Sequence, residues 1–326
     1  MSNKTNEEIE NMNKRLKKTE DNNKSINLTI EQIFKLFDEC NYNMINNIIS
    51  NKNGFDINMI INGRTLLFRA CEKNNKEVIQ LLLLNAATDV NKATADFHWQ
   101  TPLFRACLIY GNPEVVRLLL AHDNINVNQA ETKHGETPLY KACECGYEAV
   151  VRLLLAHPET DVNQVMNDGT TPLFRACQKH RFGVVQLLLA HAATDVNQAR
   201  NDGATPLYGA CQRGHEGVVW LLLTHTATKV NQSDNSGTTP MDIACQQHQT
   251  RLNTFSCSYH RLNTTKTVEL LLADSRTKRI NISVGSYYKV YYQALRNVIS
   301  KRNAKFRGLI RAAIVFKRMQ LRAALK

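Results

Sequence analysis

Apolar residues recur at helical spacing in short bursts along most of the chain. In one burst, Leu103, Ala106 and Cys107 lie at positions i, i+3 and i+4, and segment 115–119 repeats this spacing after Gly111. Such a pattern is typical of two short helices, each with one apolar face, separated by a turn at the glycine. The sequence therefore predicts pairs of short helices rather than strands.

These paired bursts belong to a unit that occurs six times. Its first five copies open with close variants of the heptad TPLFRAC, and the sixth opens with TPMDIAC. Threonine is a favourable N-cap, and proline at the first helical position lacks only an N–H that would have no partner. Each heptad therefore predicts a helix start. Units 1 to 6 begin at Thr65, Thr101, Thr137, Thr171, Thr205 and Thr239, which are 34 or 36 residues apart.

The repeated motif resembles the ankyrin repeat. The family's Thr-Pro-Leu-His-x-Ala-Ala becomes Thr-Pro-Leu-aromatic-x-Ala-Cys. Its Gly-His through Leu-Leu-Leu appears at 214–223, and its Asp-Val-Asn appears at 195–197. The resemblance covers roughly 30–283 and implies an all-α ankyrin-repeat solenoid of helix-turn-helix units with hairpin loops. An aromatic residue replaces the family's histidine, so packing is expected to replace hydrogen bonds between units.

Three segments are predicted along the chain. Residues 1–29, rich in Asn, Lys and Glu, are expected to form a polar, disordered tail; 30–283 forms the repeat domain; 284–326 forms a basic tail. Within the repeat domain, 30–61 is predicted to be a degenerate cap and full repeats follow from about residue 62. An insertion at about 250–265 interrupts the last repeat.

The basic charge of the chain is concentrated in its tail. Residues 283–326 hold 11 of the 41 Lys and Arg residues and none of the 29 Asp and Glu residues. The apolar residues after Phe306 share one face of a predicted helix. Another face carries Arg307, Arg311, Arg318 and Arg322. This basic amphipathic helix either caps the last repeat, contacts a partner or import receptor, or binds nucleic acid or an anionic membrane. The segment 306–308 resembles part of a calmodulin-binding IQ motif, but the leading Ile-Gln of that motif is missing and its last Arg comes one position early.

In the ankyrin family, the first helices and the hairpin tips line a concave groove where partners usually bind. A basic residue in the heptad, such as Arg175, lies about 160–200° around the helix from its apolar neighbours, so we expect it to be exposed. Glu72 and Glu144 are expected to compensate Arg69 and Lys141, which leaves an uncompensated cluster in units 4 and 5. The candidate groove residues are Arg69, Arg105, Lys141, Arg175, Lys179 and Arg213, of which Arg175, Lys179 and Arg213 form that cluster.

Two interpretations of these cations remain open. In the first, duplication of the unit copied a solvated residue that has no function. Such a residue is tolerated, because repulsion between two cations across about 10 Å of water is only roughly 0.4 kcal/mol. Alternatively, the groove prefers a partner with an acidic face.

A second candidate contact lies in the hairpin that precedes unit 2. Phe97 and Trp99 are found there, and Trp99 stands where other units have Gly135, Gly169 and Gly203. An aromatic side chain at a hairpin tip is typical of a binding hot spot. The alternative is that Trp99 folds back on its own loop.

The sequence offers no catalytic, cofactor or metal site. It lacks a glycine-rich phosphate loop and a nucleophile motif, and its repeated His and Asn residues are one unit apart, which fits structural roles. Six cysteines share one position and are predicted to be buried thiols. We predict a non-enzymatic, monomeric protein-binding scaffold, cytoplasmic or nuclear. The alternative is a regulatory factor whose basic tail engages nucleic acid, an anionic membrane or a calmodulin-like protein.

Overall fold

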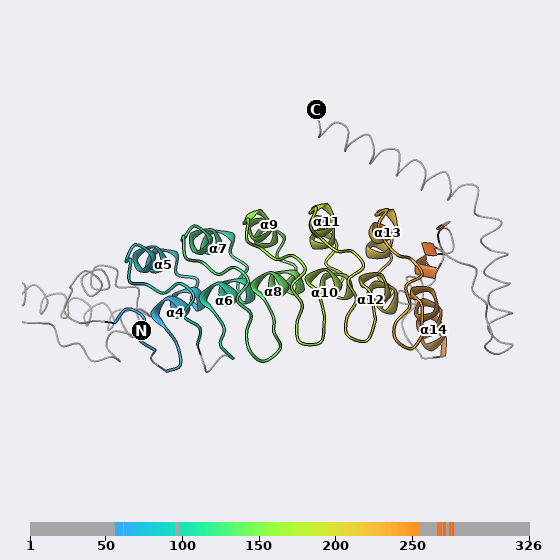
Figure 1. The fold of residues 1–326 in the computed structure, drawn as a ribbon, viewed down its shortest axis with the longest axis horizontal. Helices are drawn as coiled ribbons and strands as arrows, with labels where there is room; N and C mark the ends of the chain where they lie inside the picture. Colours follow the sequence, from blue (N-terminus) through green and yellow to red (C-terminus); the bar gives the residue numbers. More distant parts are fainter. Residues whose placement is uncertain are drawn as a thin grey trace, which may run out of the picture.

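Two parallel rows of short helices make up the described part of the chain (Figure 1). The computed structural model describes residues 56–60, 62–94, 98–253, 266–268, 270, 271, 274 and 276. The inner row consists of α4 (Leu66–Glu72), α6 (Pro102–Leu108), α8 (Pro138–Cys145), α10 (Pro172–Gln178), α12 (Pro206–Arg213) and α14 (Pro240–Asn253). The outer row consists of α5 (Lys76–Leu83), α7 (Pro113–Leu120), α9 (Glu148–Ala156), α11 (Phe182–Ala190) and α13 (Glu216–Thr224).

Units 1 to 5 each contribute one helix to each row and unit 6 contributes α14 to the inner row. Successive helices of a row pack against each other. Hairpin loops project from the side of the inner row (Figure 1). Thr94 and Gln100 form an isolated antiparallel β bridge at the base of one hairpin. The predicted all-α solenoid of helix-turn-helix units is confirmed. No helix in the described ranges combines the length and apolar character needed to span a bilayer.

The threonine of each heptad caps its inner helix, as predicted. In units 1 to 5 the Thr Oγ1 atom accepts a hydrogen bond from the N–H three residues later, at 3.0–3.2 Å. In unit 6, Asp242 N–H donates to Thr239 Oγ1 at 3.2 Å, and Thr239 N–H donates to Asp242 Oδ2 at 2.9 Å. This reciprocal pair satisfies two backbone donors at the start of α14.

The repeated spacing of apolar residues places them in one continuous core. Leu103, Cys107 and their counterparts are buried, and so is the aromatic residue of the heptad in units 1 to 5, for example Tyr140 at 1% exposure. The six cysteines at the shared position are buried thiols without disulfides, as predicted. Burial raises the pKa of these thiols, in Cys245 to about 12.

The repeated asparagines link neighbouring units. Asn163 Nδ2 donates to the Ala193 carbonyl at 2.6 Å, and its Oδ1 accepts from the Asp195 N–H at 2.9 Å. The predicted structural role is confirmed, although the amides satisfy the backbone of the next unit and not their own turn. The same bidentate link is made by Asn58, Asn91, Asn128 and Asn197.

Adjacent hairpins are joined by a second series of hydrogen bonds. The Asn201 N–H donates to the Asp168 carbonyl at 3.0 Å, and Asn201 Nδ2 donates to the Asn167 carbonyl at 3.1 Å. Gly169, with φ +81°, lies directly against Asn201. A left-handed glycine without a side chain therefore allows the two hairpins to approach.

Several sequence-based predictions concern residues outside the described ranges. They include the tail 1–29, most of the cap 30–61, most of the insertion and the basic tail 284–326. Phe97 and the tail residues Arg307, Arg311, Arg318 and Arg322 also lie outside them. Of the insertion, residues 250–253 continue α14 as helix.

Candidate functional site

The basic residues of the heptads are partly buried between units. Arg105, Lys141 and Arg175 expose 15%, 12% and 28% of their side chains. The Arg105 guanidinium lies 5.5 Å from the centre of the Phe68 ring in the preceding unit, and that of Arg175 lies 6.0 Å from the Tyr140 ring. The predicted full exposure is wrong, because a single helix pattern ignores the neighbouring inner helix that covers this side.

Glutamate side chains of the inner helices form ion pairs with the same cations. Arg105 Nη2 binds Glu72 Oε1 of the preceding unit at 2.6 Å, and Arg175 Nη2 binds Glu144 Oε1 at 2.6 Å. Lys141 Nζ lies 2.7 Å from Glu144 Oε2, so this predicted pair is confirmed. Burial alone would raise the pKa of Glu144, but the hydrogen bonds from Lys141 and the charge of Arg175 hold it below its usual value.

The predicted uncompensated cluster of Arg175, Lys179 and Arg213 is therefore wrong. Arg175 is bound by Glu144 and also donates to Gln178 Oε1 at 2.8 Å. Lys179 and Arg213 are exposed at the ends of α10 and α12. The sequence pattern considered only acids within the same helix, whereas the compensating carboxylate comes from the unit before.

Unit 5 shows that the cation over the aromatic ring has a packing role. Gly209 replaces the heptad cation, and a Cβ atom there would lie 3.2 Å from the Phe174 ring. Arg200 of the adjoining hairpin instead lies over that ring, 5.3 Å from its centre, with its Nε 2.9 Å from Asp202 Oδ1. The contact is thus preserved by a residue from another element, which favours the structural interpretation of the heptad cations.

Unit 2 has an apolar surface where the other units are polar. Its inner helix ends at Leu108 and is capped by Ile109, and both side chains are partly buried. Tyr110 follows and is 57% exposed. Cys107 and Val115 are eight residues apart, whereas the corresponding residues of units 1, 3, 4 and 5 are seven apart, so the turn of unit 2 has one additional residue, which we place at Tyr110. Glu72-Lys73, Glu144-Cys145, Gln178-Lys179 and Gln212-Arg213 occupy the positions of Leu108-Ile109 in the other units.

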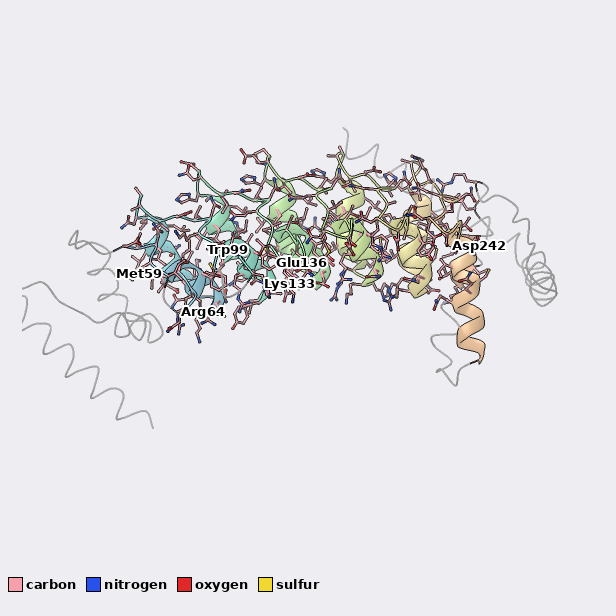
Figure 2. All side chains as sticks on the ribbon, turned by 60° about the horizontal axis from the view of Figure 1, so that its bottom comes forward. Met59, Arg64, Trp99, Lys133, Glu136 and Asp242 are labelled. Carbon is pink, nitrogen blue, oxygen red and sulfur yellow. The ribbon has the colours of Figure 1, made fainter. Side chains whose placement is uncertain are left out.

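Trp99 lies in the hairpin that leads into this unit, with 52% of its surface exposed. Its φ is +60°, a left-handed conformation that costs a residue other than glycine about 1–2 kcal/mol. Figure 2 shows it on the hairpin side, between Arg64 and Lys133 along the long axis. About half of the Trp99 surface is thus accessible from solvent, and its role as a contact residue stays a prediction. At the same position the other units have Gly63, Gly135, Gly169, Gly203 and Gly237, all with positive φ.

Neighbouring backbone groups hold the Trp99 hairpin in place. The Trp99 N–H donates to the Thr94 carbonyl at 2.9 Å, and the Thr132 N–H of the next hairpin donates to the His98 carbonyl at 2.8 Å. The strained backbone is thus fixed on both sides, and the indole is presented to solvent.

A hollow of about 480 Å³ lies between units 1 and 2. Three cations and one carboxylate contribute to its wall on the unit 1 side, and Ile109 and Tyr110 contribute on the unit 2 side. Sequence analysis identified Trp99 but not Tyr110 or this hollow; the longer turn after Cys107 was the signal that could have indicated them. The lining residues are Arg64, Arg69, Glu72, Lys73, Ile109 and Tyr110.

Groups that could hold a metal ion are absent from the described residues. The recurring histidines lie at the ends of outer helices, as predicted. The His157 Nδ1 atom, for example, accepts a hydrogen bond from the Glu159 N–H at 3.4 Å. At the ends of the inner helices, unit 2 differs from the other units by its apolar and aromatic residues Leu108, Ile109 and Tyr110.

Comparison with known proteins agrees with this architecture. A family model described as ankyrin repeats, in three copies, matches residues 36–131, 87–165, 110–200 and 191–282. The solved ankyrin repeat domain of Bcl-3, described as a unique member of the IkappaB protein family, is similar at a TM-score of 0.60 and 21% identity. The match covers 74% of this chain and 97% of the Bcl-3 chain. An ankyrin repeat domain from Acinetobacter baumannii AYE is similar at a TM-score of 0.53 and 23% identity. This match covers 64% of this chain and 96% of the Acinetobacter chain. A search of curated proteins finds no match.

Proposed function

The chain belongs to the ankyrin repeat family, and we propose that it is a non-enzymatic adaptor that binds another protein through the concave face of unit 2. Ankyrin repeats are in general protein-interaction modules, so the fold supports binding of a protein. Which surface binds it must be argued from individual residues. The proposed contact surface, named here the unit 2 surface, consists of Trp99, Leu108, Ile109 and Tyr110.

Trp99 is the observation that supports this proposal most strongly. Five units place glycine at this left-handed position, and unit 2 places a half-exposed tryptophan there. The positive φ is unfavourable for any residue other than glycine, so the backbone does not call for tryptophan here. A large aromatic side chain is well suited to anchor a partner, since it loses little side-chain entropy on binding.

The heptad cations are not part of the proposed contact surface. Arg105, Lys141 and Arg175 are engaged by carboxylates and aromatic rings of the solenoid, so a partner would have to break those contacts to use them. Binding through the basic tail rests on residues outside the described ranges and stays a prediction.

Photo-crosslinking tests the location of binding. The photoreactive residue p-benzoylphenylalanine at position 110 is expected to capture a protein from an extract of the source cells, because Tyr110 is exposed beside the hollow. The matched control carries the same residue at position 152, which is exposed on the outer helix α9. Equal capture at both positions, or capture only at 152, would contradict the proposal.

A further inference from the structure

The outer helices of units 4 and 5 are more apolar than those of units 2 and 3. In α7 and α9 the outward position after the paired valines holds the exposed Arg117 and Arg152, whereas in α13 it holds Trp220. Helix α11 contains no charged residue and begins with Phe182, which is 38% exposed. Units 4 and 5 therefore carry aromatic side chains on the outer row, where units 2 and 3 carry charged ones.

These two aromatic side chains lie on one continuous surface. A Cβ atom at Gly217 would lie 3.3 Å from the Phe182 ring, so this ring lies over the start of α13. Gly217 and Trp220 are three residues apart on that helix and share one of its faces. Helices α11 and α13 are neighbours in the outer row (Figure 1). We name Phe182, Gly217 and Trp220 the outer patch.

The end of the described part of the chain lies beside α13, the helix that carries Trp220. Lys266 Nζ is 3.3 Å from Glu216 Oε1 at the start of α13, and Arg276 Nη2 donates to the Leu223 carbonyl at 2.6 Å near its end. Fifty residues follow Arg276, and 29 of them precede the segment 306–316. A coil of 29 residues spans about 30 Å on average, whereas neighbouring helices are only about 8–10 Å apart. The segment 306–316 can therefore reach the outer patch of its own chain.

The sequence of this segment predicts a side that fits an apolar patch. At about 100° per residue, five apolar side chains would share a face about 120° wide, with Arg307 and Arg311 outside it. A helix of this length is about 16 Å long, enough to cross two neighbouring outer helices. The five apolar residues are Phe306, Leu309, Ile310, Ala313 and Phe316.

We propose that the segment 306–316 docks through its apolar face on the outer patch of the same chain, with its arginines in solvent. Because the segment is tethered, its effective concentration at the patch is of millimolar order, and a weak contact is sufficient. Docking there covers the apolar face of the segment and hides it from a membrane or a calmodulin-like protein. The unit 2 surface belongs to the inner row and stays accessible, so this inference does not depend on the proposed function.

Two glutamines of the outer row provide a matched pair for the test. Gln80 of α5 and Gln186 of α11 are both exposed, and both occupy the outward position that Trp220 holds in α13. Gln186 is one helical turn from Phe182, whereas Gln80 lies three units away. With p-benzoylphenylalanine at position 186 of the purified full chain, we expect at least about fivefold more cross-linking to 306–316 than with it at position 80. Peptide mass spectrometry measures both yields.

Substitutions on each side of the contact test which side chains hold the segment. Leu309→Asp places a carboxylate in the apolar face and is expected to lower the yield at position 186 about fivefold. Val315→Asp places the same group on the other side of the predicted helix and is expected to change the yield less than about twofold. Trp220→Gln is expected to act as Leu309→Asp does, and the solenoid already accepts glutamine at this position in α5 and α11.

Equal yields at positions 80 and 186, or no cross-link to 306–316, would overturn the inference. So would equal effects of Leu309→Asp and Val315→Asp. In a mixture of unlabelled and ¹⁵N-labelled chains, a cross-linked peptide pair that carries both labels would assign the outer patch to a second copy of the chain instead. None of these outcomes bears on the proposed function, because the experiment uses the purified chain without its partner.

Discussion

Trp99→Gly is expected to weaken binding of the partner captured at position 110 by about 30-fold, which is the loss typical of a hot-spot residue. The same change is expected to leave the free energy of unfolding unchanged or to raise it by about 1 kcal/mol, because glycine adopts the left-handed conformation without strain. Titration calorimetry with that partner and urea unfolding of the full chain measure the two effects. Most changes that remove a large side chain lower stability, so this combination is diagnostic.

Trp99→Ala separates the effect of losing the indole from the effect of relieving backbone strain. Alanine removes the indole but keeps a Cβ atom at φ +60°, so it is expected to weaken binding as much as glycine while giving no gain in stability. If both variants bind as wild type does, Trp99 has no role in recognition. If glycine lowers stability clearly below that of wild type, the tryptophan supports the hairpin and its strain is not evidence of function.

Gly169→Ala is expected to lower the free energy of unfolding by about 3 kcal/mol. The left-handed backbone at φ +81° accounts for about 1 kcal/mol of this loss. A Cβ atom would also lie 2.3 Å from Asn201 Oδ1 and 2.7 Å from its backbone N. Separating the hairpins would sacrifice the two hydrogen bonds that Asn201 makes, each contributing about 1 kcal/mol. Urea unfolding of the full chain gives the measurement.

Gly237→Ala is the matched control for this prediction. Gly237 has nearly the same φ, +83°, but no atom lies within 4 Å of a Cβ atom built there. The expected loss is therefore about 1 kcal/mol. Equal losses for the two variants would mean that hairpin contacts contribute little and that backbone conformation alone decides the effect.

Local signals in the sequence were sufficient for the helices, and the resemblance to the ankyrin repeat gave their arrangement as a solenoid. Threonine followed by proline specifies a helix start through one side chain and one missing N–H, and the spacing of Leu103, Ala106 and Cys107 specifies the buried face. Both depend on residues within one turn of each other. The same is true of the buried thiols, since Cys107 lies on that face.

Contacts between units could not be derived in the same way. Arg175 was expected to be exposed and uncompensated, and the structure pairs it with Glu144, 31 residues earlier. The pairing depends on the register of one inner helix against the next, which a single helix pattern does not contain. Tyr110 was missed for a different reason: its signal was one additional residue in a turn, and this becomes meaningful only when the turns of all units are compared.

Amide hydrogen exchange of the full chain, with and without the partner captured at position 110, tests the central claim most directly. The claim is that unit 2 holds the partner. We expect slower exchange in residues 98–111, which include the Trp99 hairpin, α6 and the turn at Tyr110, and no change in α9 and α11. Slower exchange confined to the outer helices, to α10 and α12, or to the basic tail would contradict it.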